Sequence, residues 1–285
     1  MSRPDLGAFA ANIYSQNGED GILGEVFTRL ADGVSLDHWC VEFGAWDGVH
    51  LSNTCRLIRE DGYSAVLIEG HPSRASELEK NFPEARVHKI CRFIQLEGPN
   101  SLESTLMAFP IPQEFDFLSI DVDGCDYWIW KSLVSFNPKV VCIEFNQTVP
   151  NSVSFVQEKD FSVKQGAGAK ALVQLGEEKG YSLVAVTHCN LIFVRSDFRH
   201  LVTDQEESLE KLNPAGNGGT FVFSGYDGHL IFSADTLDFP WHGASVKAST
   251  IQALPRILRV FPGNLGKVRR VIWRFWNRKT RARKG

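Results

Sequence analysis

No two cysteines in the sequence are spaced as CxxC, and the six cysteines, at positions 40, 55, 91, 125, 142 and 189, mostly fall within apolar stretches. Structural zinc sites need closely spaced ligands and disulfide frameworks belong mainly to small secreted proteins, so neither is expected. The sequence also lacks the run of roughly 18 apolar residues that crosses a membrane, and no basic segment followed by an apolar one opens it. These absences predict a cytoplasmic protein with reduced cysteines.

Acidic residues are absent after Asp238. The residues up to Asp238 hold all 34 acidic residues and 18 of the 30 basic ones, a net charge of −16, whereas the remainder holds twelve basic residues. Charge segregated in this way indicates two functions in one chain. We therefore predict a main domain over residues 1–245 and a basic tail over residues 246–285.

Strand-like and helix-like segments alternate along the main domain. Apolar stretches predict strands at 38–44, 64–70, 85–93, 115–122 and 139–146, and two short strands within 181–195. Apolar residues at helical spacing predict helices at 17–31, 52–61, 73–82, 100–109, 126–136 and 168–180. This alternation predicts an α/β fold with a doubly wound, mostly parallel, seven-stranded sheet that ends in an antiparallel hairpin.

Three of the predicted helices begin with a capping signal. Asn17 precedes the first helix and Asp126 precedes the fifth, and both residue types are favoured as N-caps. Asn100 is followed three residues later by Glu103, which is the spacing of a capping box.

Acidic residues also follow the predicted strands, at the edge where an open parallel sheet binds its ligands. Taken strand by strand, they are Glu42 and Asp47, then Glu69, then Asp121, Asp123 and Asp126, and then Glu144 with the amide Asn146. Burying so many like charges is costly unless a cation or hydrogen bonds compensate. A calcium loop of the EF-hand type is excluded, because Gly124 stands at position 4 of the loop instead of position 6.

The turn after the first strand suits a positively charged ligand. Gly44 and Gly48 would let the backbone approach that ligand closely, but the GxxxG spacing and the preceding acid are unlike the GxGxxG fingerprint of dinucleotide binding. S-adenosylmethionine carries a sulfonium and an ammonium group. Glu42 and Asp47 would face that cationic end, and Glu69 would accept both ribose hydroxyls. The alternative is an ordinary strand-to-helix turn.

Six stretches of the sequence resemble those of a known protein family: YSQNGEDGIL (14–23), VEFGAWDGVHLSNT (41–54), LIEGHP (67–72), LSIDVDGCDYWIW (118–130), VVCIEFN (140–146) and YSLVAVTHCNLIFVR (181–195). Together they resemble the FkbM-like group of class I S-adenosylmethionine-dependent methyltransferases. The resemblance implies a Rossmann-like fold, with the SQNGED stretch folded over the cofactor so that Gln16 or Asn17 touches it. Trp46 stands where many methyltransferases have a glycine. The implied cofactor-binding residues are Gln16, Glu42, Gly44, Asp47, Gly48, Asn53, Glu69 and Asp121.

Asp121, Glu144 and Asn146 resemble the metal ligands of O-methyltransferases of the macrocin and catechol types. The resemblance implies Mg²⁺ or another divalent cation at these residues, with Asp121 and Asp123 as the catalytic pair and Asp123 as the base. Glu144 and Asn146 are separated by one position, whereas the catechol enzyme has an adjacent pair. The alternative is that both organise loops or bind substrate hydroxyls without a metal.

The expected function is methyl transfer to a hydroxyl of a small molecule or glycan, specifically a sugar of a glycan, glycolipid or natural product. The sugar acceptor is implied by the family resemblance alone. Residues 147–167 and 196–245 are expected to form the acceptor pocket, because they are irregular insertions at the active edge. Two other classes stay open: a non-catalytic nucleotide-binding module tethered to membrane or RNA, and an NAD-dependent oxidoreductase.

Two further elements are predicted near the C-terminus. The stretch TFVFSGYDGHLIF (220–232) predicts a β-hairpin that turns at Asp227-Gly228 and forms an appendage to the sheet. Within residues 254–285, apolar residues at helical spacing alternate with basic ones and predict an amphipathic helix. Aromatic and basic residues together favour an anionic lipid surface on the inner side of the membrane over nucleic acid or a solvated tail.

Overall fold

The computed structural model describes residues 3–204, 208–217, 220–239 and 242–281. The chain divides into two compact units, Met1–Asn217 and Gly218–Gly285. This division falls ahead of residue 246, the predicted start of the basic tail.

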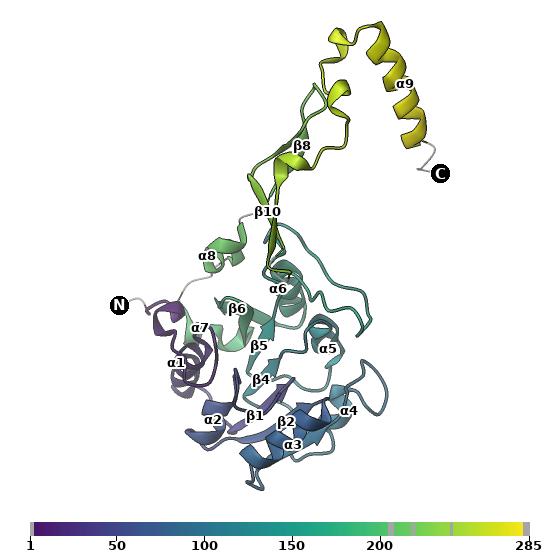
Figure 1. The fold of residues 1–285 in the computed structure, drawn as a ribbon. Coiled ribbons are helices and arrows are strands. Elements are labelled where there is room, and N and C mark those ends of the chain that lie inside the picture. The colour runs from purple at the N-terminus through teal and green to yellow at the C-terminus, as the bar shows by residue number, and fades with distance from the viewer. Residues whose placement is uncertain (1–2, 205–207, 218–219, 240–241, 282–285) are drawn as a thin grey trace. The chain divides into compact units, whose positions relative to one another are not determined.

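The first unit is built on a seven-stranded sheet in the order β3-β2-β1-β4-β5-β7-β6 (Figure 1). The strands are β1 (Trp39–Phe43), β2 (Ser64–Glu69), β3 (Val87–Cys91), β4 (Phe117–Ile120), β5 (Val140–Glu144), β6 (Tyr181–Val186) and β7 (Asn190–Arg195). Strands β1 to β5 pair in parallel, and β7 runs antiparallel to both β5 and β6. The predicted doubly wound, mostly parallel sheet is therefore confirmed.

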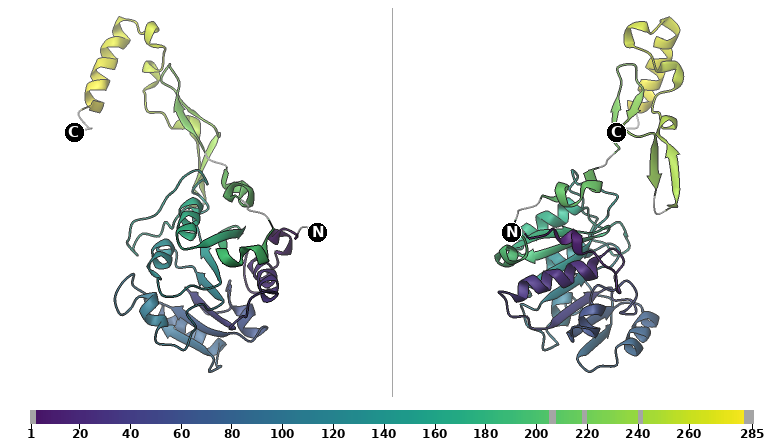
Figure 2. Two further views of the ribbon diagram at one scale, coloured as in Figure 1. Left: turned by 180° about the vertical axis from the view of Figure 1, so that it is seen from behind. Right: turned by 90° about the vertical axis from the view of Figure 1, so that its left-hand side faces the viewer.

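Helices cover both faces of this sheet (Figure 2). They are α1 (Glu19–Ala31), α2 (Cys55–Arg59), α3 (Pro72–Asn81), α4 (Leu102–Leu106), α5 (Asp126–Ser132), α6 (Ala169–Glu178), α7 (Arg199–Val202) and α8 (Leu209–Leu212). Side chains alternate between the faces along each strand, so Cys40 packs with α1, α2, α3 and α7 while Val41 packs with α4, α5 and α6. Burial on both faces explains why the strands read as continuous apolar runs.

The starts of α1 and α4 differ from their predicted capping residues. Gly18, not Asn17, is the N-cap of α1, at a φ of +96° where a Cβ would lie 2.6 Å from the Cβ of Ala10. In α4 the N-cap is Ser101, whose hydroxyl accepts the N–H of Ser104, and not Asn100. The carboxylate of Glu103 accepts the N–H groups of Val134 and Ser135 instead of closing a capping box.

The start of α5 also differs from the prediction. Asp126 is its first residue and Cys125 its N-cap. The buried carboxylate of Asp126 accepts the N–H groups of Val122 (2.9 Å) and Gly124 (3.0 Å), so it holds together the loop between β4 and α5. Burial raises the pKa of Asp126 to about 7.

The second unit contains two hairpins and a helix. The predicted hairpin is present as β8 (Val222–Ser224) and β9 (Leu230–Phe232), but it forms its own two-stranded sheet and does not extend the seven-stranded one. A further hairpin, β10 (Thr236–Phe239) with β11 (Ala244–Lys247), was not predicted, because its sequences TLDF and ASVK have little apolar character. Helix α9 spans Lys267–Arg281 and confirms the core of the predicted basic helix.

Within residues 3–204, 208–217, 220–239 and 242–281, none of the helices has the length and apolar character needed to cross a membrane.

Candidate active site

Glu42, at the end of β1, anchors the loop that leads into α2. Its side chain is only 5% exposed. Its carboxylate accepts the N–H of Asn53 (2.8 Å) and the hydroxyls of Ser52 (2.7 Å) and Thr54 (2.8 Å). Burial raises the pKa of Glu42 to about 7, although these hydrogen bonds act in the opposite direction. The carboxylate of Glu42 therefore positions the loop, and its predicted place beside the cationic end of the cofactor stays a prediction.

The titration of Glu42 predicts a pH-dependent stability. Its pKa is raised in the folded protein, so its contribution is fully present below the pKa of the unfolded chain and is lost as pH rises through about 7. We expect the free energy of unfolding to fall by up to about 3 kcal/mol between pH 5 and 8 from this group. Glu42→Gln should remove this pH dependence, because the glutamine amide does not titrate. The loop contact is kept, because the hydroxyl of Thr54 can rotate to accept a hydrogen bond from the amide. Urea unfolding at several pH values measures both slopes, and equal slopes would contradict the assignment.

Gly44 and Gly48 are required by protein packing. A Cβ on Gly44 would lie 1.6 Å from the carbonyl oxygen of Asp121, so the ends of β1 and β4 approach more closely than any other residue allows. A Cβ on Gly48 would lie 2.5 Å from Leu78 and Phe82, which belong to the α3 side of the core. Both glycines have positive φ angles, +82° and +76°. Both glycines therefore allow a close approach within the protein, and their predicted close approach to a ligand stays a prediction.

Glu69 ends β2 with its carboxylate half-buried and oriented. One oxygen accepts the N–H of Trp46 (2.9 Å) and the other that of His71 (2.6 Å). An ionised carboxylate has about four lone-pair sites, so each oxygen keeps one for a ligand. Glu69 therefore joins the loop after β1 to the loop after β2 and still presents acceptors there.

Asp47 and Asn53 stabilise the loop between β1 and α2, to which both belong. The carboxylate of Asp47 accepts the N–H groups of Val49 (2.9 Å) and His50 (2.7 Å), which makes a local turn. Asn53 is buried, and its amide donates to the hydroxyl of Ser119 (3.1 Å). In this conformation both side chains organise the protein side of the predicted cofactor site.

The segment before α1 is fixed to the turn between β6 and β7. The amides of Gln16 and Asn17 lie 3.5 Å and 3.1 Å from the sulfur of Cys189. Asn190, next in the chain, pairs in register with Glu144 across β5 and β7. Gln16 and Asn17 are therefore brought to the turn that adjoins the end of β5, as the predicted fold of the SQNGED stretch requires.

The acids of SQNGED explain that placement. Glu19 is fully buried and accepts from the hydroxyl of Thr187 (2.6 Å) and the amide of Asn190 (3.0 Å). Asp20 accepts the N–H groups of residues 13, 14 and 15. Sequence reasoning treated these acids as helix-start residues and missed their long-range role, since only the fold reveals that residue 19 meets residue 190.

Asp121, Asp123 and Glu144 form a carboxylate cluster, with one oxygen from each lying within 4.8 Å of the others. Burial and the nearby carboxylates raise the pKa of both Asp121 and Glu144. Asp123 is exposed and adopts a φ of +55°, unusual for a residue other than glycine. A cation between these groups would remove the repulsion.

Asn146 is not needed to complete that cluster. Its amide nitrogen donates to the carbonyl of Gln165 (2.6 Å), and its oxygen accepts from the N–H (2.9 Å) and hydroxyl (2.5 Å) of Thr148. It therefore holds the loop after β5 in place, which is the loop-organising alternative left open above. The third acid of the cluster is Asp123.

One neighbour of the cluster has unused hydrogen-bonding capacity. Asn190 is 3% exposed, and among the described residues nothing donates to its Oδ1. Buried polar atoms nearly always have a hydrogen-bond partner, so we expect this oxygen to have one as well. It belongs to the residue paired with Glu144.

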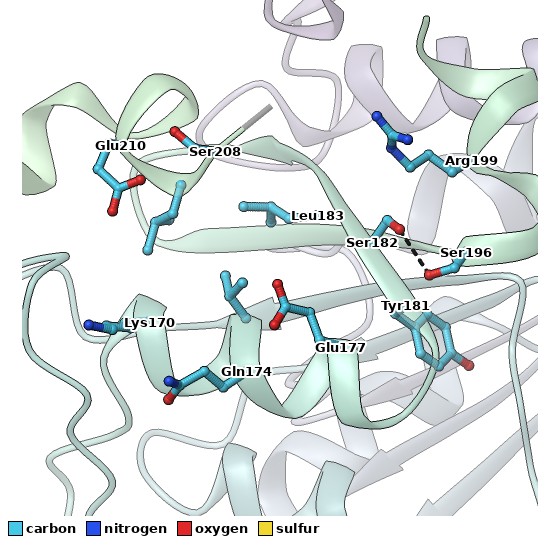
Figure 3. Close-up of a pocket in the computed structure, with 12 residues that line it drawn as sticks. Lys170, Gln174, Glu177, Tyr181, Ser182, Leu183, Ser196, Arg199, Ser208 and Glu210 are labelled. Atoms are coloured by element: carbon cyan, nitrogen blue, oxygen red, sulfur yellow. Dashed lines mark hydrogen bonds between the residues drawn. The ribbon is translucent and has the colours of Figure 1, made fainter. Parts of the chain in front are cut away.

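A pocket of about 660 Å³ lies elsewhere in this unit, between α6, β6 and α8 (Figure 3). Glu177, Leu183 and Arg199 are among its lining residues. None of the acids of the candidate site borders it. Part of its wall comes from one of the segments expected to form an acceptor pocket, through Ser196, Arg199, Ser208, Leu209 and Glu210. The pocket lies at the edge strand β6 and not beside the carboxylate cluster.

No protein-family model matches the chain, and no curated protein matches it significantly. Three solved structures illustrate the matches found. The CMeT domain of the citrinin polyketide synthase shares 12% identity over 65% of this chain and 55% of that one, with a TM-score of 0.40. The N-terminal domain of EvdMO1, solved with SAH and D-fucose, shares 13% over 64% and 84%, with a TM-score of 0.39. The mitomycin 7-O-methyltransferase MmcR shares 15% over 61% and 54%, with a TM-score of 0.35.

The chain spans about half the length of the first and third of these structures. Identities of 12 to 15% leave its activity to be argued from its own residues. Its architecture follows from the strand order and from the single antiparallel strand β7. The chain has a Rossmann-like, doubly wound α/β fold.

Proposed function

We propose that the chain is an S-adenosylmethionine-dependent O-methyltransferase that acts on a hydroxyl of a sugar-containing glycan, glycolipid or natural product. The observation that carries the proposal is the arrangement of acids along one edge of the sheet. Glu69 ends β2, and the cluster of Asp121, Asp123 and Glu144 follows β4 and β5. The sugar acceptor is the part that rests on the family resemblance described above.

The residues at this edge fit S-adenosylmethionine. Glu69 is held in place by two N–H groups and keeps acceptor sites for two ribose hydroxyls. The acids beyond β4 and β5 suit a sulfonium and an ammonium group, because opposite charges attract most strongly where water is excluded. When bound, the cofactor supplies a methyl group activated by the adjacent positive sulfur.

The cluster fits a hard divalent cation such as Mg²⁺. Three carboxylates within 4.8 Å of one another provide the oxygen ligands that such ions prefer. The buried Oδ1 of Asn190, next to Glu144, is a further oxygen without a donor among the described residues. Asp121 and Glu144 would hold the ion beside Asp123, and the ion would lower the pKa of a bound hydroxyl.

We infer that Asp123 takes the proton from the acceptor. It is exposed, so a substrate hydroxyl can reach it, and its unusual backbone conformation is held by Asp126, which accepts the N–H groups on either side of it. The acceptor oxygen forms a bond to the methyl carbon as the bond from carbon to sulfur breaks, and the proton passes to the carboxylate of Asp123. Removing this proton matters because a neutral hydroxyl is a weak nucleophile.

Calorimetry with S-adenosylhomocysteine tests the cofactor site. We expect micromolar binding to the wild type and a loss of at least about a hundredfold in Glu69→Ala, since two charge-assisted hydrogen bonds contribute about 1.5–3 kcal/mol each. Glu97→Gln, at an exposed acid that pairs with Lys159, is the control and should bind normally. Binding of NAD without binding of S-adenosylhomocysteine would identify an oxidoreductase instead.

The acceptor is found separately, by methyl transfer from labelled S-adenosylmethionine to an array of glycans. Label on a sugar hydroxyl supports the proposed acceptor class. Label on protein or nucleic acid alone would show that the acceptor class is wrong while leaving the cofactor site intact.

A further inference from the structure

Helix α9 presents an apolar stripe to solvent. Val268, Val271, Ile272 and Phe275 follow the spacing i, i+3, i+4 and i+7, so they share one face of the helix. Their exposed fractions are 73%, 53%, 37% and 70%. Basic residues occupy much of the remaining surface, namely Lys267, Arg269, Arg270, Arg274 and Arg278.

The second unit offers this helix little core of its own. Among described residues 220–239 and 242–281, the buried apolar side chains are those of Ala248 and Leu258. A helix of 15 residues whose apolar stripe stays largely exposed is marginally stable in water. An external surface that buries the stripe would stabilise it.

The charge of the region selects the kind of surface. No acidic residue follows Asp238, whereas twelve basic residues do. A second copy of the helix would bring like charges together, and a nucleic acid would neutralise the arginines but leave Val268 and Phe275 in water. An anionic bilayer satisfies both features, since its headgroups attract the basic residues and its acyl region accepts the apolar ones.

We propose that α9 lies in the interface of an anionic lipid bilayer, with the stripe of Val268, Val271, Ile272 and Phe275 immersed and the arginines at the headgroups. The long arginine side chains can extend toward the phosphates while their methylene groups stay against the apolar region. This binding is independent of the methyl-transfer activity proposed above.

Sedimentation of the full chain with vesicles tests the proposal. Vesicles of phosphatidylcholine containing phosphatidylglycerol should bind the protein, pure phosphatidylcholine should bind it weakly, and added salt should reduce binding. The double variant Val271→Ser with Phe275→Ser should bind at least about tenfold more weakly, because burying such side chains contributes about 1.5–3 kcal/mol each. Val134→Ser is the control, because Val134 in the first unit is 73% exposed, as Val268 of the stripe is. This variant should bind like the wild type.

Arg270→Gln with Arg274→Gln separates the charge contribution. Binding to the anionic vesicles should fall by about thirtyfold, since each of the two basic residues near the surface contributes about 1 kcal/mol. Anionic vesicles should also protect the backbone amides of α9 from hydrogen exchange.

Three results would overturn the proposal. The first is vesicle binding that the serine variants leave unchanged. The second is protection of α9 by an oligonucleotide but not by anionic vesicles. The third is a concentration-dependent dimer, abolished by the serine variants, in a protein that ignores vesicles.

Discussion

Replacing Gly44 by alanine is expected to destabilise the protein by about 3–5 kcal/mol and to abolish S-adenosylhomocysteine binding. The new Cβ would lie 1.6 Å from the carbonyl oxygen of Asp121 and 2.8 Å from its carbonyl carbon. Backbone atoms cannot rotate away as a flexible side chain can, so β1 and β4 must separate at their ends. That separation displaces the loop of Glu42 and the carboxylate cluster together. Urea unfolding and calorimetry measure the two effects.

Gly62→Ala is the matched control for this change. Gly62 also has a positive φ, +73°, but a Cβ there would meet no atom within 4 Å. It isolates the cost of the left-handed backbone, about 1–2 kcal/mol, from the cost of the clash. If both variants lose the same stability, the close approach of β1 and β4 is not what requires glycine at position 44.

Replacing Asp123 by asparagine should lower the rate of methyl transfer by about 10²–10⁴-fold, because the amide cannot accept the proton. S-adenosylhomocysteine affinity should stay within about threefold of the wild type, since the backbone and Asp126 that support position 123 are unchanged. The rate is measured with the acceptor that the glycan array identifies. An unaltered rate would remove Asp123 from the chemistry.

Asp121→Asn tests the role of the metal separately from the role of the base. We expect it to weaken Mn²⁺ or Mg²⁺ binding by about tenfold to a hundredfold in calorimetry without acceptor, and to remove stimulation of the rate by the ion. Glu97→Gln, at an exposed acid outside the cluster, should leave both unchanged. Full activity in excess EDTA, together with an active Asp121→Ala variant, would show that the cluster works without a metal.

The sheet and the residues at its edge could be predicted because their signals are local. Runs such as Val140 to Glu144 are buried on both sides and read as strands, and acids that follow parallel strands meet at one edge. This reasoning placed Glu69, Asp121, Asp123 and Glu144 correctly at the ends of their strands. The antiparallel β6–β7 hairpin was likewise visible from two apolar runs around a short polar turn.

The roles of individual side chains could not be predicted as well, because they depend on contacts between distant segments. Glu42 is occupied by Ser52, Asn53 and Thr54 only once the loop has its actual path. Asn146 is directed to Gln165 by the same kind of loop geometry. Residue spacing shows which side chains share an edge, but it does not show which of them the protein uses for its own hydrogen bonds.

The position of β7 between β5 and β6 determines when the site can be completed during synthesis. The chain must extend beyond Asn190 before Glu19 finds its partners and before the neighbour of Glu144 exists. A nascent chain that ends earlier leaves an open flank on β5 and a loose segment ahead of α1. We therefore expect a nascent chain to bind S-adenosylhomocysteine only once β7 has joined the sheet.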